Sequence, residues 1–281
     1  MASRVSNHFA TALWVLALVL AAAGCGSKKS STGPTTLTWN TMTSGTASSL
    51  PGIWGNSASD VFAVGENGTI LHYNGTAWSA MTSGSTAYFQ GVWSASGSDA
   101  FAVAPVGTNG VILHYNGTAW SDVTPGSIAN VICVWGSAGS DVFVAGYNGT
   151  ILHYNGTAWS TMTSGTTAEL SGLWGNSSSD VFAVGYGGVI LHYNGSTWSA
   201  MTSGSTANLK CVWGLSGSNV FAAGDGGTIL HYNGTAWSAM VSGTTASLPG
   251  IWGSSGNDVY AVGYAGYSGT ILHTTGRLGV P

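Results

Sequence analysis

The sequence predicts an all-β fold, a six-bladed β-propeller with four antiparallel strands in each blade. Three observations lead to this prediction. One unit is written six times along the chain. Each unit holds four short segments that are rich in β-branched or aromatic residues and separated by Gly, Asn, Ser and Asp. The chain also contains 44 Gly and 13 Trp, as expected of turn-dense β structure. A period of about 40 residues with four strands per unit is typical of propeller blades.

Two landmarks mark the repeat. A tryptophan recurs at spacings of 39, 42, 39, 39 and 39 residues, and a histidine in an Ile-Leu-His context follows it in every unit. The tryptophans are Trp54, Trp93, Trp135, Trp174, Trp213 and Trp252, and the histidines are His72, His114, His153, His192, His231 and His273.

The strands are predicted in order from the first unit. The first strand ends at Gly52–Trp54, the second covers Val61–Val64, the third Thr69–Tyr73 and the fourth Thr76–Met81. Between the third and fourth strands stands Asn74-Gly75, which predicts a type I′ turn with positive φ at both residues.

The two ends of the repeat array predict how the ring closes. The last unit stops after its third strand at His273, without a tryptophan-containing fourth strand. That missing strand matches Leu37–Met42 near the start of the chain, where Trp39 stands in the place of Trp78. We therefore expect residues 36–281 to form the propeller, with the N-terminal strand paired to the C-terminal one in a one-plus-three closure.

The first 24 residues are predicted to be a signal peptide. Arg4 precedes the apolar stretch Ala10–Ala23, which is too short to span a bilayer and fits a secretory h-region. The run Ala22-Ala23-Gly24-Cys25 resembles a bacterial lipobox, which implies a lipid on Cys25, with residues 25–35 as a flexible tether. This resemblance implies a bacterial cell-envelope lipoprotein, at the outer membrane or cell surface, that meets the membrane only through its anchor. The alternative is a plain signal peptide with an incidental cysteine.

Charge excludes one class of partner. The chain has only five Lys and Arg residues, and beyond residue 35 only Lys210 and Arg277 remain. Binding to nucleic acid requires basic side chains that neutralise phosphates. We therefore expect no nucleic-acid partner.

The polar residues shared by the units are interpreted as structural. An aspartate, replaced once by Asn219, precedes each second strand, where a short side chain can cap the amides of its turn. The six histidines are expected to make hydrogen bonds between strands or blades rather than to bind a metal. Cys133 and Cys211 replace a glycine on the innermost strands of blades three and five, too far apart for a disulfide, and are expected to be free and buried. No metal, cofactor or catalytic set is predicted.

Residues that depart from the repeat are the candidate binding residues. They gather in the connection between blades and in the turn between the second and third strands, which we expect on one face of the ring around the channel mouth. This combination of aromatic and polar groups suits stacking on a sugar or gripping a peptide, although neutral drift in tolerant loops is the alternative. The candidates are Tyr88, Phe89, Gln90, Asn130, Tyr147, Glu169, Tyr186, Asn208, Lys210, Asp225, Tyr264 and Tyr267.

The repeats also resemble known propeller families. The run Asn74–Trp78 resembles a degenerate Asp-box with Asn in place of Asp, and the array from Trp39 to His273 is similar to the BNR-type repeats of sialidase-like and photosystem II assembly-factor-like proteins. The pattern WGxSxxDVFAVGxxGTILHYNG is similar to repeats of bacterial surface lipoproteins, a resemblance that implies no established chemistry. Sialidases bind their substrate through an arginine cluster, which this chain lacks beyond its leader.

These observations favour a lipid-anchored, monomeric, non-catalytic binding or scaffold module for a glycan or protein partner. The alternative from another class is a secreted polysaccharide hydrolase or lyase acting in a pocket on the same face. Glu169 and Asp225 would then be the carboxylates to test. A purely structural role in a surface layer is the third possibility.

Overall fold

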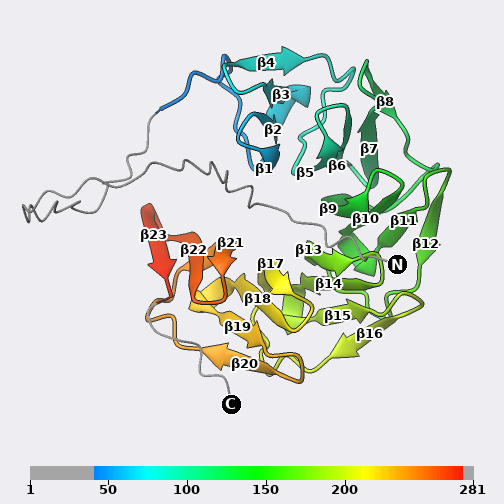
Figure 1. Ribbon diagram of the computed structural model, residues 1–281. Helices are drawn as coiled ribbons and strands as arrows, with labels where there is room; N and C mark the ends of the chain where they lie inside the picture. The colour runs from blue at the N-terminus through cyan, green and yellow to red at the C-terminus, as the bar shows by residue number, and fades with distance from the viewer. Residues whose placement is uncertain (1–40, 275–281) are drawn as a thin grey trace, which may run out of the picture.

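The computed structural model describes residues 41–274, which form a six-bladed β-propeller (Figure 1). Six antiparallel sheets follow one another in chain order, and we number the blades one to six accordingly. Within each sheet the strands lie in sequence order. The first strand of each blade contacts the first strand of the next, from β1 through β5, β9, β13 and β17 to β21, so these strands form the inner wall. The predicted fold class and blade number are confirmed.

The bounds of the strands are as follows. Blade one has β1 (Gly52–Ser57), β2 (Asp60–Val64), β3 (Ile70–Tyr73) and β4 (Trp78–Met81); blade two has β5 (Gly91–Ser96), β6 (Asp99–Val106), β7 (Asn109–Tyr115) and β8 (Trp120–Asp122). Blade three has β9 (Val131–Ala138), β10 (Asp141–Gly146), β11 (Ile151–Tyr154) and β12 (Trp159–Met162); blade four has β13 (Leu170–Ser177), β14 (Asp180–Gly185), β15 (Ile190–Tyr193) and β16 (Trp198–Met201). Blade five has β17 (Leu209–Ser216), β18 (Asn219–Gly224), β19 (Ile229–Tyr232) and β20 (Trp237–Met240); blade six has β21 (Ser247–Ser255), β22 (Asp258–Ala265) and β23 (Ser268–His273).

Four predicted bounds of the first blade differ from the structure. The first strand does not end at Trp54 but continues to Ser57, and the fourth begins at Trp78 rather than Thr76. The second and third strands each differ by one residue, beginning at Asp60 and Ile70. The predicted closing strand Leu37–Met42 lies outside the described residues except for Thr41 and Met42, which belong to no strand. Its pairing with the C-terminal strand stays a prediction.

The turn between the third and fourth strands also differs from the prediction. Gly75 has φ 92°, but Asn74 is not among the residues with positive φ. Instead, Asn74 Oδ1 accepts hydrogen bonds from the amides of Thr76 and Ala77, at 3.0 and 3.1 Å. The asparagine therefore forms an Asx-type turn through its side chain, and this explains its recurrence in five units without a type I′ turn.

Neighbouring blades pack through aromatic side chains. The phenylalanine of the second strand is fully buried in blades one to five, and in blades one to four it meets the tyrosine and tryptophan of the following blade. Phe101, for example, lies 5.7 Å from Tyr154 and 6.0 Å from Trp159 between ring centroids. Edge-to-face contacts of this kind add to the free energy gained by burial.

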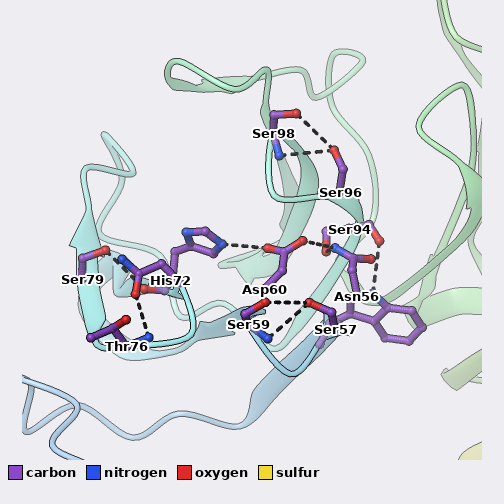
Figure 2. Close-up of polar contacts among 12 residues, drawn as sticks. Asn56, Ser57, Ser59, Asp60, His72, Thr76, Ser79, Ser94, Ser96 and Ser98 are labelled. Carbon is purple, nitrogen blue, oxygen red and sulfur yellow. Dashed lines mark hydrogen bonds and ion pairs between the residues drawn. The ribbon is translucent and has the colours of Figure 1, made fainter. Parts of the chain in front are cut away.

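Each blade is also braced by the repeated histidine. Figure 2 shows Asp60 between His72 and Asn56: Asp60 Oδ1 lies 2.8 Å from His72 Nε2, and Asp60 Oδ2 accepts a hydrogen bond from Asn56 at 3.0 Å. The structural role predicted for both residues is confirmed, but the predicted partner of the aspartate was wrong. Its side chain pairs with the histidine of the neighbouring strand β3 rather than with the amides of its own turn. The serine hydroxyl of Ser57 accepts from the Ser59 amide instead.

Cys133 and Cys211 are free, as predicted. Each residue is partly exposed as a whole, yet its thiol is enclosed: Cys133 Sγ contacts the carbonyl oxygens of Ala145 and Leu170 at 3.5 and 3.6 Å. Burial raises the pKa of both thiols to about 12. These are packing residues rather than nucleophiles.

Candidate functional site

The turns between second and third strands and the connections between blades lie on one face, which we name the top face. The connection leading into a blade accepts a hydrogen bond from the turn of that blade. The amide of Tyr147 donates to Asn130 O at 2.8 Å, and the amide of Tyr186 donates to Glu169 O at 2.9 Å. The same contact joins Asp225 to Asn208 at 2.9 Å. The sequence prediction that these two variable segments share a surface is therefore correct.

The turns hold their first side chain outward by an unusual backbone. In the turn Tyr147–Gly149, Asn148 has φ 56° and Gly149 has φ 67°. A Cβ at Gly149 would lie 1.9 Å from Thr166 O, so only glycine fits there. Tyr147 and Tyr186 begin their turns and are both exposed. Blades one, three, four and five therefore each present one variable side chain at the same place in this turn.

Lys210, on β17, is the centre of a polar cluster on this face. Its Nζ donates a hydrogen bond to Tyr186 OH at 3.0 Å and lies 4.2 Å from the centroid of the same ring. Asp225 Oδ2 lies 3.7 Å away on the other side. Burial tends to lower the pKa of Lys210, but the hydrogen bond to Tyr186 and the negative charges of Asp225 and Glu169 outweigh it, so the net pKa is raised. The ammonium group is held charged and oriented.

Asp225 is the most heavily engaged carboxylate of the cluster. Its Oδ1 accepts a hydrogen bond from Ser247 at 2.7 Å, and its Oδ2 accepts one from Asn208 at 3.2 Å. The hydrogen bond from Ser247 is the main cause of its lowered pKa, with Asn208 and Lys210 acting in the same direction against partial burial. Asp225 is therefore a structural anion that positions Lys210, and it is poorly suited to act as a general acid.

Glu169 has more free capacity for a ligand. Among the described residues its carboxylate accepts one side-chain hydrogen bond, from Ser171 at 3.2 Å, whereas an ionised carboxylate can accept about four. The pKa of Tyr147 is raised, mainly because this side chain is partly buried and secondly because the negative charge of Glu169 is near. Tyr147 thus stays a neutral phenol that can donate or accept a hydrogen bond.

The structure brings together half of the candidates predicted from the sequence. Tyr147, Glu169, Tyr186, Asn208, Lys210 and Asp225 form the cluster, which spans the neighbouring blades three to six through Ser247. Ser171 and Ser247 were missed, because they stand at the starts of inner strands, where serine is unremarkable in this sequence.

The other candidates lie elsewhere, and one prediction was wrong. Phe89 is completely buried in the hydrophobic core between blades one and two, since its place in the repeat faces inward, as do Leu170, Leu209 and Leu248. Gln90 is partly buried, and its amide donates to Val103 O. Asn130 bonds the longer turn of blade two through Val106 N and Gly107 O. Three tyrosines are exposed on the top face away from these contacts, namely Tyr88, Tyr264 and Tyr267.

A groove of about 720 Å³ lies beside the cluster on blade five. Its walls come from Gly204–Ser205, Gly226–Leu230 and Ala239–Thr245, which carry hydroxyl, apolar and backbone groups but no charge. It therefore offers space without a specific recognition group. Within residues 41–274 no three His, Cys, Asp or Glu side chains are grouped as metal ligands. No helix in that part of the chain is both long and apolar enough to cross a bilayer.

The comparisons with known proteins give solved structures only. No family model matches the chain, and no curated protein sequence matches it. Similar solved structures include one described as YCF48 bound to D1 peptide, with a TM-score of 0.45 and 15% identity over 82% of this chain and 95% of that one. Another is YCF48 from Cyanidioschyzon merolae, with a TM-score of 0.44 and 17% identity over 81% of this chain and 95% of that one.

Proposed function

We propose that this chain is a non-catalytic binding module of the bacterial cell envelope that grips a segment of a partner protein on its top face. The observation that carries the proposal is the cluster around Lys210, in which Tyr186 and Asp225 hold one cation while Tyr147 and Glu169 remain able to contact a ligand. Tyrosine supplies a rigid apolar ring with a polar end, which is why it is enriched at protein interfaces.

The charges of the cluster favour a partner segment with a basic side chain. Asp225 is occupied by Ser247, Asn208 and Lys210, so its charge is largely balanced within the protein. Glu169 has no basic partner among the hydrogen bonds and ion pairs of the described residues. A lysine or arginine of the partner placed against Glu169 would also lie near the rings of Tyr147 and Tyr186, where cation–π contacts add to the attraction.

An enzymatic role has weaker support. A glycosidase needs one carboxylic acid that is protonated near neutral pH, and the pKa of Asp225 is shifted the opposite way, mainly by Ser247. Glycan binding without catalysis uses the same exposed tyrosines and is therefore an outcome that the experiment must separate.

The proposed location rests on the sequence. Cys25 and the leader lie outside the described residues. The short apolar stretch followed by a small-residue run and cysteine supports a lipid on Cys25, and the polar residues 26–35 would hold the propeller away from the membrane. Metabolic labelling with a fatty-acid probe would mark the parent chain and leave the Cys25→Ala chain unmarked. Equal labelling of both would contradict the anchor.

Parallel arrays test the binding role. The full-length chain is applied to an array of 15-residue peptides of varied charge and to a glycan array, and the retained glycans are assayed for new reducing ends. We expect retention on peptides with a basic residue beside apolar ones, weakened by Glu169→Gln and unchanged by Leu215→Ala, an exposed residue near the first-to-second-strand turn on the opposite face. Retention on glycans alone, or turnover of a glycan, would overturn the proposal.

A further inference from the structure

Blade six presents an apolar face that its counterparts bury. Val262 is 45% exposed and Ile271 is 75% exposed, whereas the residues at these places in blades one to four are almost completely buried. Ile53, on the inner strand of blade one, is 68% exposed, although Val92 and Val212 at the same place in other blades are buried. In Figure 1, β21–β23 and β1–β4 are the two ends of the arc of blades. We name the junction between these two blades the seam.

A contact repeated across four of the other five junctions shows what the seam lacks. The inner-strand tryptophan of one blade packs on a glycine of the next, so closely that a Cβ at Gly175 would lie 2.4 Å from the Trp135 ring. The same contact joins Trp93 to Gly136, Trp174 to Gly214 and Trp213 to Gly253. At the seam the corresponding residues are Trp252, which is 50% exposed, and Gly55, whose nearest neighbours all belong to blade one.

The connections between blades show a second unfilled contact. Each one bridges the second-to-third-strand turns of the two blades that it links. The connection from blade one to blade two, for example, accepts a hydrogen bond from Gly68 N at Ala87 O, 2.8 Å away. A Cβ at Gly68 would lie 1.8 Å from Ser85 O of that connection. At Gly269, the corresponding glycine of blade six, no atom lies within 4 Å of such a Cβ.

The start of the described chain already has the form of such a connection. Ser44 Oγ donates to Thr46 O at 3.2 Å, as Ser83 Oγ does to Ser85 O. Gly45 has φ 74°, close to the 70° of Gly84. The forward contact is also made, since the amide of Glu66 in blade one donates to Ser49 O at 3.1 Å. Only the contacts toward blade six are unfilled.

The residues that precede this connection match the strand that blade six lacks. Thr36–Met42 aligns with the fourth strands, with Trp39 in the place of Trp78 and Met42 in the place of Met81. In blade three the methionine of this strand contacts the next blade: Met162 Sδ lies 3.4 Å from Trp198 Nε1 of blade four. β23 pairs only with β22 among the described strands, so its outer edge is open to a fourth strand.

We propose that residues 36–42 of the same chain dock on the outer edge of β23, and that this strand seats blade six against blade one with Trp252 over Gly55. The register follows from the repeat. Ile70 pairs with Met81 and Leu71 with Ala80, so Ile271 pairs with Met42 and Leu272 with Thr41. The connection 44–50 then bridges the turns of blades six and one, with the Gly269 amide donating to Ser48 O.

Engineered disulfides test directly the proposed register between residues 36–42 and β23. The full-length chain with alanine at its three native cysteines receives Thr41→Cys and Leu272→Cys. A matched control receives Leu191→Cys and Ala200→Cys, a pair that β15 and β16 hold in the same register. We expect both chains to form an intramolecular disulfide under mild oxidation, seen by mass spectrometry as a cross-linked monomer. A disulfide in the control alone would overturn the proposal, as would a seam disulfide found only between two chains, which would mean that the strand comes from a second copy.

Amide hydrogen exchange on the unsubstituted chain tests the same strand without any substitution. We expect the amides of β23 that face away from β22 to be protected within about tenfold of the corresponding amides of β19, which β20 covers. Exchange of these β23 amides at the rate of an open edge strand would contradict the docking.

Discussion

His231 Nε2 lies 2.9 Å from Asn219 Oδ1, at the place where the other five blades pair a histidine with an aspartate. Blade five therefore keeps the brace between its second and third strands without the carboxylate. An amide oxygen accepts a hydrogen bond from a neutral imidazole, but it offers little to stabilise an imidazolium. Consistent with this, burial lowers the pKa of His231 below its ordinary value of 6.5.

This pair predicts how stability depends on pH. Because the folded pKa of His231 is lower than the unfolded one, the unfolded chain takes up the proton more readily. The contribution of His231 to stability is complete above pH 6.5 and is lost as the pH falls through the folded pKa. Asn219→Asp supplies a carboxylate that raises the pKa of His231, so we expect the variant to lose less stability than the parent between about pH 7.5 and about pH 5.5 in urea unfolding.

The histidines of the other five blades are present in both chains, so the difference between the two pH profiles isolates blade five. Adding His231→Gln to both chains should abolish that difference. Identical profiles for the parent and Asn219→Asp would contradict the pairing.

The thiols of Cys133 and Cys211 should be unreactive in the folded protein. With a pKa of about 12, each is almost entirely protonated at pH 8, and reagents such as Ellman's reagent require the thiolate. We expect no release of the coloured product from the folded chain over minutes, and reaction of both residues after unfolding in urea. Rapid labelling of the folded chain, or a bridge between these two cysteines, would show that the blade assignment is wrong.

Two glycines with the same backbone conformation should respond differently to alanine. Gly149 and Gly165 have φ 67° and 74°, but a Cβ at Gly149 would meet Thr166 O at 1.9 Å, while a Cβ at Gly165 would meet nothing within 4 Å. Gly165→Ala should cost about 1 kcal/mol of unfolding free energy, the cost of a left-handed conformation alone. Gly149→Ala should cost several times more, because the connection between blades must move. Equal changes in denaturant midpoint would refute this reading of the turn.

The carboxylate of Asp225 provides a test of the top-face cluster. The hydrogen bond from Ser247 is the largest cause of its lowered pKa, and the hydrogen bond from Asn208 lowers it less. Carboxyl carbon NMR titrations should therefore show a larger rise in the pKa of Asp225 for Ser247→Ala than for Asn208→Ala. Lys210→Gln should change the unfolding free energy by less than about 1 kcal/mol, since the ion pair is partly exposed. The reverse order of the two pKa changes would contradict the geometry of the cluster.

The blade number and strand order could be predicted from the sequence because tryptophans, histidines and turn residues recur in it at a nearly constant spacing. Contacts between distant positions were harder to predict. The bond between Asp60 and His72 joins residues 12 apart, and it requires the register of two strands, which the spacing alone does not give. Phe89 was predicted to lie on the surface because it differs from the leucine found at this position in other repeats. Both residue types are apolar, however, and both are buried at this position.

The sequence predicted which face carries the candidate residues, but not which of them contact one another. Lys210 and Asp225 belong to blade five and Tyr186 to blade four, and the curvature of the ring decides which loop residues meet. Ser247 carried no signal in a serine-rich sequence. The turn at Asn74 misled for a related reason, since an Asn-Gly pair serves both a type I′ turn and an Asx-type turn, and the length of the loop selects between them.

The central claim is that the top face binds the partner. The most direct measurement is the affinity of the full-length chain for the tightest-binding array peptide, compared with a variant in which Tyr88, Tyr147, Tyr186 and Tyr264 are alanine and with Leu215→Ala on the opposite face. We expect the four-tyrosine variant to lose at least about 100-fold in affinity while its melting temperature stays near that of the parent, and Leu215→Ala to bind normally. Unchanged affinity in the four-tyrosine variant, or loss of binding in Leu215→Ala, would contradict the claim.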